Sequence, residues 1–320
     1  MNRNIKLRDY YLTRDNAEVY VAEYGNEKGF PVIYIHGGPG GSCSEQSCNF
    51  FDNSFYHIYL LDQRGSGKSK EKYSRTNNNT SALIEDIKFL IETKISSQPC
   101  LLFGGSWGST LSLLFAEKYP QYVAGLILRG IFLARKKDLD FYLSSNGAAM
   151  LRPLEYRKLL TCLDLEIGKN YQAEIISKKI IERIDKEPNL DSAEIIELAH
   201  AFAEFESSLC TIGEQNHHAS DEDALSYTIL ENHYFINNCF IEENQILNEI
   251  DKLKNIDFID IYHGSFDLVC SLEAAVSLKD RLPQANLHII QTASHSPFEP
   301  SLFNSLKESC ARFQKLHSNN

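Results

Sequence analysis

The chain has 320 residues, of which 43% are hydrophobic and 23% charged, a composition that fits a globular protein and excludes collagens, coiled coils and disordered chains. Its 32 basic and 43 acidic residues give a net charge of −11 without a local basic stripe, so we expect no nucleic-acid partner. The N-terminus lacks the apolar segment of a secretory signal, and no run of about 18 apolar residues predicts a membrane span, so we expect no membrane partner.

Eight cysteines are spread along the chain, with no Cys-x-x-Cys pair and no spacing typical of a zinc site. In a chain without an export signal, free thiols in the cytoplasm are the expected state. The sequence has no His-Glu-x-x-His motif, and Gly67-Lys68-Ser69 ends like a phosphate-binding loop whose required earlier glycine is replaced by Asp62. We therefore expect no metal and no organic cofactor.

Strand-like and helix-like segments alternate at both ends of the chain. In chain order, apolar β-branched or aromatic runs predict strands at 32–35, 57–61, 100–103, 124–128, 258–262 and 287–290. Helical patterns predict helices at 81–96, 107–118, 272–279 and 301–315. Buried strands that alternate with helices are typical of an α/β fold with a mostly parallel sheet and helices on both faces.

The middle of the chain differs from both ends. From Ala134 to Asp251 the strand signals vanish, and the segment has 23 acidic and 11 basic residues, whereas the rest has 20 and 21. We therefore predict a helical cap at 134–251, inserted into a catalytic core made of 1–133 and 252–320. Its negative charge fits a solvated surface, and it also fits an acidic lid that attracts cationic groups to a site beneath it.

The strongest motif is Gly104-Gly105-Ser106-Trp107-Gly108, which matches G-x-S-x-G. It lies directly after the predicted strand 100–103 and directly before the predicted helix 107–118. Such a tight turn holds the serine in a strained conformation and exposes its hydroxyl at the carboxyl edge of the sheet. An incidental serine in a glycine-rich turn would give the same letters, but the position between strand and helix favours a nucleophile.

A serine hydroxyl needs a base, and the base needs an orienting acid. In one known chain order the serine comes first, then the acid and then the histidine. Asp267 follows the predicted strand 258–262, and His295 follows the predicted strand 287–290, so both belong at the sheet edge where the serine lies. Asp260, Asp280 and His288 are weaker candidates, because they fall inside predicted strands or a helix.

The negatively charged oxygen of an acyl-transfer intermediate needs two hydrogen-bond donors. One is the backbone N–H of the residue after the serine, which is Trp107. The other should come from a glycine-rich loop after an early strand, and the loop from His36 to Gly41 follows the strand 32–35. We predict the N–H of Gly38 as the second donor, and a plain turn without a catalytic role is the alternative for this loop.

Together these segments resemble the proline iminopeptidases, the prolyl aminopeptidases of the α/β-hydrolase fold. The resemblance is carried by His36-Gly37-Gly38-Pro39-Gly40-Gly41, Asp62-Gln63-Arg64-Gly65-Ser66-Gly67-Lys68-Ser69, Gly104-Gly105-Ser106-Trp107-Gly108-Ser109-Thr110-Leu111, Leu128-Arg129-Gly130-Ile131-Phe132-Leu133, Glu231-Asn232-His233-Tyr234-Phe235 and His263-Gly264-x-x-Asp267. These segments run in the family's order from near residue 30 onward. The Asp-Gln-Arg-Gly-Ser-Gly and Glu-Asn-His-Tyr-Phe segments are the most specific.

The resemblance implies a helical cap whose glutamates bind the free amino terminus of a peptide. Glu206 and Glu231 match these glutamates, and Phe132, Phe235 and Cys270 match the wall around a proline ring. Carboxylates that face a desolvated amine offset the cost of removing it from water. Without the resemblance, the two glutamates would be read as solvent-facing helix residues and the other three as ordinary core.

The chain departs from the family at three places. The family usually has Arg-Tyr where this chain has Ser265-Phe266, usually has Gly where this chain has Ser294, and often has Trp where this chain has Phe205. The predicted triad is intact at all three positions. We expect these departures to bear on the strictness of proline preference, because they belong beside the substrate pocket.

The predicted function is therefore a cytoplasmic serine aminopeptidase that releases N-terminal proline from short peptides through an acyl-enzyme. A broader carboxylic ester or amide hydrolase of the same fold is the alternative within enzymes. An inactive α/β-hydrolase scaffold that only binds its ligand is the alternative outside them. Nothing in the sequence predicts an oligomeric state.

Overall fold

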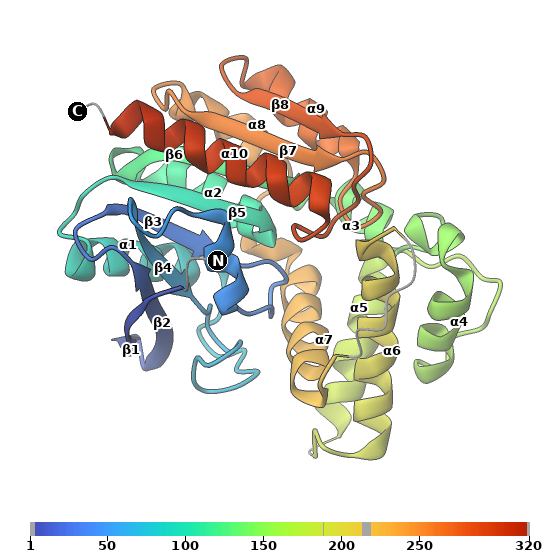
Figure 1. Ribbon diagram of the computed structural model, residues 1–320. Coiled ribbons are helices and arrows are strands. Elements are labelled where there is room, and N and C mark those ends of the chain that lie inside the picture. Colours follow the sequence, from blue (N-terminus) through green and yellow to red (C-terminus); the bar gives the residue numbers. More distant parts are fainter. Residues whose placement is uncertain (1–3, 188, 213–218, 319–320) are drawn as a thin grey trace.

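The computed structural model describes residues 4–187, 189–212 and 219–318 (Figure 1). Its centre is an eight-stranded sheet with the order β1-β2-β4-β3-β5-β6-β7-β8. The strands are β1 (Lys6–Arg14), β2 (Ala17–Gly25), β3 (Phe30–Ile35), β4 (Tyr56–Leu61), β5 (Cys100–Ser106), β6 (Val123–Ile131), β7 (Ile259–Gly264) and β8 (Asn286–Ile290). All neighbours from β4 to β8 are parallel, which confirms the predicted α/β fold.

The two N-terminal strands were not predicted from the sequence. They form an antiparallel hairpin, and β2 joins the sheet by antiparallel pairing with β4. β1 is largely exposed, so its sequence lacks the apolar run that marks a buried strand. The turn at Asp15 and Asn16 has positive φ angles of 50° and 64°, a conformation that these two residue types tolerate well.

Helices cover both faces of the sheet, as predicted. On one face α1 (Thr80–Lys94), α2 (Trp107–Lys118) and α9 (Leu272–Arg281) share a core cluster with the strands. On the other face α10 (Pro300–His317) and the short helix η1 (Glu45–Phe50) bury aromatic and aliphatic side chains against the sheet. A central sheet enclosed in this way fixes the carboxyl ends of its parallel strands, where the predicted site residues lie.

Between β6 and β7 the described residues form helices and no strand, and η2 (Pro120–Tyr122) precedes β6. The helices after β6 are α3 (Lys136–Leu143), η3 (Ala148–Leu151), α4 (Pro153–Cys162), α5 (Ala173–Lys186), α6 (Ala193–Cys210), α7 (Asp221–Ile236), η4 (Asn238–Phe240), α8 (Gln245–Glu249) and η5 (Ile250–Leu253). Figure 1 shows α4 to α7 beside one end of the sheet, while α8 and η5 return to contact α2. The division into a core and a cap at 134–251 stays a prediction.

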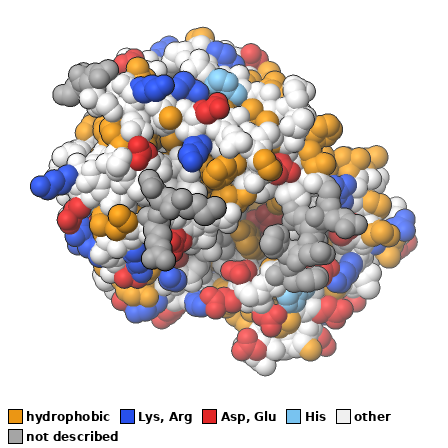
Figure 2. Space-filling model, in the orientation of Figure 1, with side chains coloured by type: hydrophobic (Ala, Val, Ile, Leu, Met, Phe, Trp, Pro, Cys, Tyr) orange, Lys and Arg blue, Asp and Glu red, His pale blue; other side chains and the backbone are white. Residues whose placement is uncertain are grey.

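The surface of this helical region carries much of the acidic charge. Most charged side chains at its free end are Asp or Glu in the space-filling view (Figure 2). Among the described helices, none combines the length and apolar character needed to cross a bilayer.

Candidate active site

The predicted nucleophile lies at a sharp turn between strand and helix. β5 ends at Ser106 and α2 begins at Trp107, and Ser106 has φ 56° and ψ −128°. A methyl group on Gly108 would lie 2.1 Å from the Ile35 carbonyl oxygen, and one on Gly104 would lie 2.2 Å from the Gly108 carbonyl oxygen. Only glycine therefore lets α2 approach β3 and β5 this closely. The positive φ of Ser106 stores strain of about 1–3 kcal/mol, which the packed turn sustains.

Asp267 and His295 form a buried pair at the carboxyl ends of β7 and β8. Asp267 Oδ2 lies 2.8 Å from His295 Nδ1, and Oδ1 accepts hydrogen bonds from the N–H groups of Val269 at 3.0 Å and Cys270 at 2.8 Å. Burial alone would raise the pKa of Asp267, but His295, His263 and the Cys270 N–H together hold it below the usual value. Asp267 is thereby kept as a carboxylate that orients the imidazole.

The free nitrogen of His295 faces an arginine that the sequence reasoning missed. Arg129, near the end of β6, lies with Nη1 3.1 Å from His295 Nε2, and the same group donates to the His295 carbonyl at 2.9 Å. Burial lowers the pKa of His295; the nearby Asp267 opposes this shift, and the charge of Arg129 adds to it. A neutral imidazole with its proton on Nδ1 is the form that a general base needs.

Ser106 ends β5 and His295 follows β8, so both lie at the carboxyl edge of the parallel part of the sheet. Within the described residues no hydrogen bond joins them, and Ser106 Oγ lies 3.9 Å from Cys270 Sγ. Cys270 also donates its N–H to Asp267, so it lies between the serine and the Asp–His pair. If the predicted roles hold, His295 Nε2 exchanges Arg129 for Ser106 before a proton is transferred, and such catalytic bonds commonly tighten only when substrate binds.

The glycine-rich loop after β3 lies against the predicted nucleophile. Gly38 lines the same cavity as Ser106, and a methyl group on Gly37 would lie 3.9 Å from Ser106 Oγ. Trp107 is the first residue of α2, so its N–H has no acceptor within the helix. Both predicted oxyanion donors therefore belong to backbone that borders the serine.

The Asp-Gln-Arg-Gly segment supports this loop. Gln63 Nε2 donates to the His36 carbonyl at 2.8 Å, and Gln63 Oε1 accepts from Trp107 Nε1 at 2.8 Å. Asp62 accepts from the Cys43 N–H at 2.7 Å at the other end of the loop. The Gln63 side chain thus connects the loop after β3 to Trp107, the first residue of α2.

A cavity of about 20 Å³ brings most of the predicted residues together. It is lined by Gly38, Ser106, Phe132, Tyr142, Glu206, Glu231, Phe235, Val269 and Cys270. Its size suits about one water molecule, so a proline ring must widen it on entry. Tyr142 and Val269 were not predicted, because an aromatic residue in a cap helix and an aliphatic residue in a loop carry no sequence signature of a site.

Two carboxyl groups, one half-buried and one buried, form the roof of this cavity. Glu206 comes from α6 and Glu231 from α7, and Tyr142 Oη donates to Glu231 Oε2 at 3.5 Å. Burial raises the pKa of Glu206 to about 7. Burial and the charge of Glu206 raise the pKa of Glu231 well above its ordinary value. Neither carboxyl forms an ion pair within the described residues, so the roof is electrostatically ready for a cation.

Two of the three departures from the family lie away from the cavity. Phe266 is 56% exposed, and Ser265 Oγ donates to the Gln291 carbonyl at 2.8 Å. Phe205 is fully buried and packs against Tyr142, with ring centroids 6.1 Å apart. Ser265, Phe266 and Phe205 do not line the cavity, and Phe205 borders it through Tyr142, which does.

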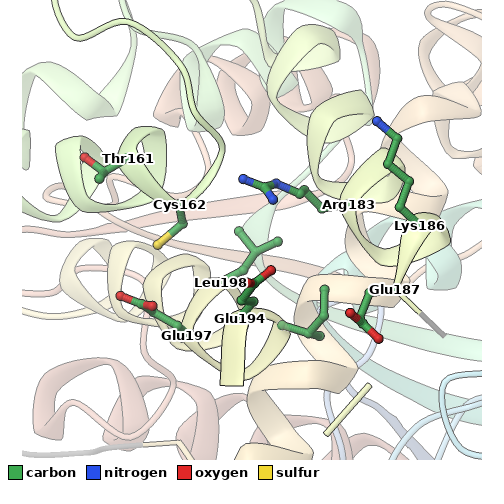
Figure 3. Close-up of a pocket in the computed structure, with 9 residues that line it drawn as sticks. Thr161, Cys162, Arg183, Lys186, Glu187, Glu194, Glu197 and Leu198 are labelled. Atoms are coloured by element: carbon green, nitrogen blue, oxygen red, sulfur yellow. The ribbon is translucent and has the colours of Figure 1, made fainter. Parts of the chain in front are cut away.

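A larger cleft lies elsewhere in the helical region. It has a volume of about 470 Å³ and is lined from α4, α5, α6 and the chain after α5, with charges of both signs such as Arg183 and Glu194 (Figure 3). None of the predicted site residues lines it. Among the described residues, no cluster of three or more His, Cys, Asp or Glu side chains is arranged to hold a metal ion.

The chain is similar to known proteins in both sequence and fold. Residues 31–153 match the model of the α/β hydrolase fold family. The chain is similar to the proline iminopeptidase of Xylella fastidiosa, with 36% identity over 91% of each chain, and to that of Neisseria meningitidis, with 35% identity over 93% of each chain. It also superposes on an esterase from Exiguobacterium antarcticum with a TM-score of 0.61 and 19% identity, covering 96% of this chain and 98% of the esterase, a likeness that concerns the fold alone. With such identity to curated relatives over nearly their whole length, this chain belongs to the proline iminopeptidase family.

Proposed function

We propose that this protein is a serine aminopeptidase that releases proline from the free amino terminus of short peptides. The observation that carries the proposal is the pair of carboxyl groups, Glu231 buried and Glu206 half-buried, that line the cavity with Ser106 and form no ion pair among the described residues. A peptide amino terminus is a cation that fits such a roof. Its first carbonyl then lies within reach of the serine below.

In the proposed reaction the Ser106 hydroxyl oxygen attacks the carbonyl carbon of the first residue, and His295 Nε2 takes the hydroxyl proton. The N–H groups of Gly38 and Trp107 stabilise the negatively charged oxygen of the tetrahedral intermediate. The imidazolium passes its proton to the nitrogen of the leaving peptide as the amide bond breaks. Water then hydrolyses the acyl-enzyme by the same route, which frees proline and restores the serine.

Asp267 holds the imidazole in position throughout this sequence. Its bond to Nδ1 fixes the proton on that nitrogen and stabilises the imidazolium as it forms. Residues of this chain and water account for every bond and proton in the scheme. Location in the cytoplasm stays a prediction.

Selection of the terminal residue follows from the roof and walls of the cavity. A peptide whose amine is acetylated offers no cation to Glu206 and Glu231. Their carboxyl groups then stay without a partner in the cavity, and this costs binding energy. Phe132 and Phe235 stack edge to face, with ring centroids 6.4 Å apart, and provide apolar walls for a pyrrolidine ring. Both features favour a small, cationic, cyclic first residue.

The decisive experiment compares three substrates of the unmodified protein: a proline arylamide, its N-acetyl derivative and a short acyl ester. We expect rapid cleavage of the proline arylamide and a loss of at least about 100-fold in kcat/KM on acetylation, because buried charge pairs are worth about 2–5 kcal/mol. Equal turnover of both arylamides would contradict the amine-anchor proposal. A strong preference for the ester would favour the broader ester or amide hydrolase instead.

An inactive binding scaffold is tested separately by a fluorophosphonate probe, which labels only an activated serine. We expect labelling of the unmodified protein and none of Ser106→Ala. Absence of labelling in both would favour the scaffold.

A further inference from the structure

We propose that the Ser294 hydroxyl fastens the end of α6 to the loop that carries His295, so that the amine-binding helix and the catalytic base keep a fixed relation. This inference rests on the proposed function, because it assigns Glu206 of α6 to the substrate amine. Ser294 is the third departure from the family, which usually has glycine there. We call the group formed by Cys210, Ser294 and Glu299 the α6 clasp.

The clasp begins at an unsatisfied helix end. α6 ends at Cys210, and the last carbonyls of a helix have no donor within it. The Cys210 carbonyl instead accepts the N–H of His295 at 3.1 Å, the N–H of Ser296 at 2.9 Å and the hydroxyl of Ser294 at 2.7 Å. Consecutive residues around the predicted base thus all bond to one oxygen of the cap helix.

Glu299 completes the clasp from the start of α10. Its Oε2 accepts the Ser294 N–H at 2.5 Å, and its Oε1 accepts the Ser294 hydroxyl at 2.9 Å and the Ile212 N–H at 3.1 Å. Ser294 is only 1% exposed, so its single hydroxyl proton is shared between Cys210 and Glu299 away from bulk water. Glycine at this position would keep the backbone bonds and lose both hydroxyl contacts.

The clasp connects Glu206 on α6 to the loop that carries His295 through one turn of the helix. Glu206 precedes Cys210 by four residues on α6, and residues at this spacing lie on one face of a helix. A displacement of Cys210 therefore displaces Glu206 as well. The imidazole itself is held separately, by the hydrogen bond to Asp267. Loss of the hydroxyl should thus leave the base competent but loosen its relation to the amine anchor, which makes Ser294 a positioning residue.

The test uses Ser294→Ala, with Ser296→Ala as the matched control. The control removes a neighbouring hydroxyl, which among the described residues accepts one long 3.4 Å bond from the Phe298 N–H and forms no hydrogen bond with Cys210. Amide hydrogen exchange should quicken about fivefold at His295 and Ser296 in Ser294→Ala, in keeping with the loss of one hydrogen bond. The control should exchange at those two amides like the unmodified protein.

Kinetic measurements then distinguish two roles for Ser294: linking the position of Glu206 to that of His295, or merely holding His295 in place. We expect kcat/KM of Ser294→Ala to fall about fivefold for a proline arylamide, mainly through KM, and less than about twofold for a short acyl ester. In a Glu206→Gln background the same serine change should have little further effect on the arylamide, because the anchor is already lost.

Unchanged exchange in Ser294→Ala would overturn the inference, and so would an equal fall for arylamide and ester. Amide hydrogen exchange needs no substrate, so it measures the stability of the α6 clasp independently of the proposed reaction. If the unmodified protein failed to cleave proline arylamides while Ser294→Ala still lost protection, the peptidase assignment would fall and the clasp would remain as a structural contact.

Discussion

Two buried carboxyl groups, one in the sheet core and one in the helical region, have pKa values shifted in opposite directions. Asp267 is 6% exposed and Glu231 2% exposed, so both have lost almost all contact with water. Asp267 receives two backbone N–H groups and faces His295, and its pKa is lowered. Glu231 receives one long bond from Tyr142 and faces Glu206, and its pKa is raised.

This contrast teaches that the partners of a buried carboxyl, more than its burial, decide its charge. In the core half, the Asp267 charge already has its partners, whereas His295 Nε2 faces Arg129 and forms no hydrogen bond with Ser106 among the described residues. The cap half is incomplete, because its two carboxyl groups lack a cation within the described residues. In the proposed function the substrate amine supplies that cation.

The largest expected effect is on the core half. Ser106→Ala removes the proposed nucleophile, so kcat for a proline arylamide should fall about 10⁴-fold or more, while binding of a proline-terminated peptide should persist. Steady-state kinetic assays measure kcat, and isothermal titration calorimetry measures peptide binding. Retained turnover would show that another group attacks the carbonyl.

Changes in the cap half should act selectively. Glu206→Gln and Glu231→Gln each replace a carboxylate with an uncharged amide of the same shape, and kcat/KM for a proline arylamide should fall about 100-fold. Cleavage of a short acyl ester, which has no amine, should change less than about threefold. If ester cleavage fell as far as arylamide cleavage, the contrast between the two halves would be wrong.

The pH dependence should separate the halves without any mutation. The pKa of Glu206 is raised to about 7, so its carboxylate is lost as the pH falls through 7 and amine recognition weakens. The pKa of His295 is lowered, so the neutral base that ester cleavage needs persists to more acidic pH. The acidic limb of kcat/KM should therefore lie at higher pH for the arylamide than for the ester.

Glu206→Gln provides the control for this comparison. With that carboxyl gone, we expect the separation between the two acidic limbs to shrink. Coincident limbs in the unmodified protein would mean that one group controls both reactions.

Glu117 of α2 is an exception on the core side and gives the smallest effect. It is 5% exposed, its Oε1 has no hydrogen-bond partner among the described residues, and burial raises its pKa to about 8. The folded state therefore binds a proton that the unfolded state has already released, so stability falls as the pH rises from about 4.5 to about 8.

Glu117→Gln removes this penalty, because the amide stays neutral at every pH. We expect the free energy of unfolding to exceed that of the unmodified protein by about 1–3 kcal/mol at pH 9 and to differ little at pH 5. Urea unfolding at the two pH values measures the difference. An equal effect at both would show that Glu117 is not the titrating group.

Much of the core half could be predicted because its signals are local. The glycines around Ser106 announce the turn, and Asp267 and His295 each follow a strand whose parallel neighbours end at the same sheet edge. The residues of the cap half could be predicted only from the family resemblance, because glutamates on amphipathic helices look like surface residues. Glu206 and Glu231 meet through the packing of α6 on α7, which no short pattern encodes.

Other parts of the site lie beyond any residue pattern. The Cys210 carbonyl that holds the histidine loop is a backbone atom, and any residue there would supply it. The contact between Arg129 and His295 joins residues 166 positions apart, from β6 and the loop after β8. Such contacts depend on how elements are placed in space, so only the folded structure reveals them.

The small volume of the cavity above Ser106 limits which parts of other proteins can reach the Ser106 hydroxyl. A space of about 20 Å³ beneath Glu206 and Glu231 has no room for a loop of a folded neighbour. A thin, loose chain end can enter once the walls yield, whereas internal segments of intact proteins stay outside. In the proposed function, the roof that selects the amine thus also keeps folded proteins from being cleaved.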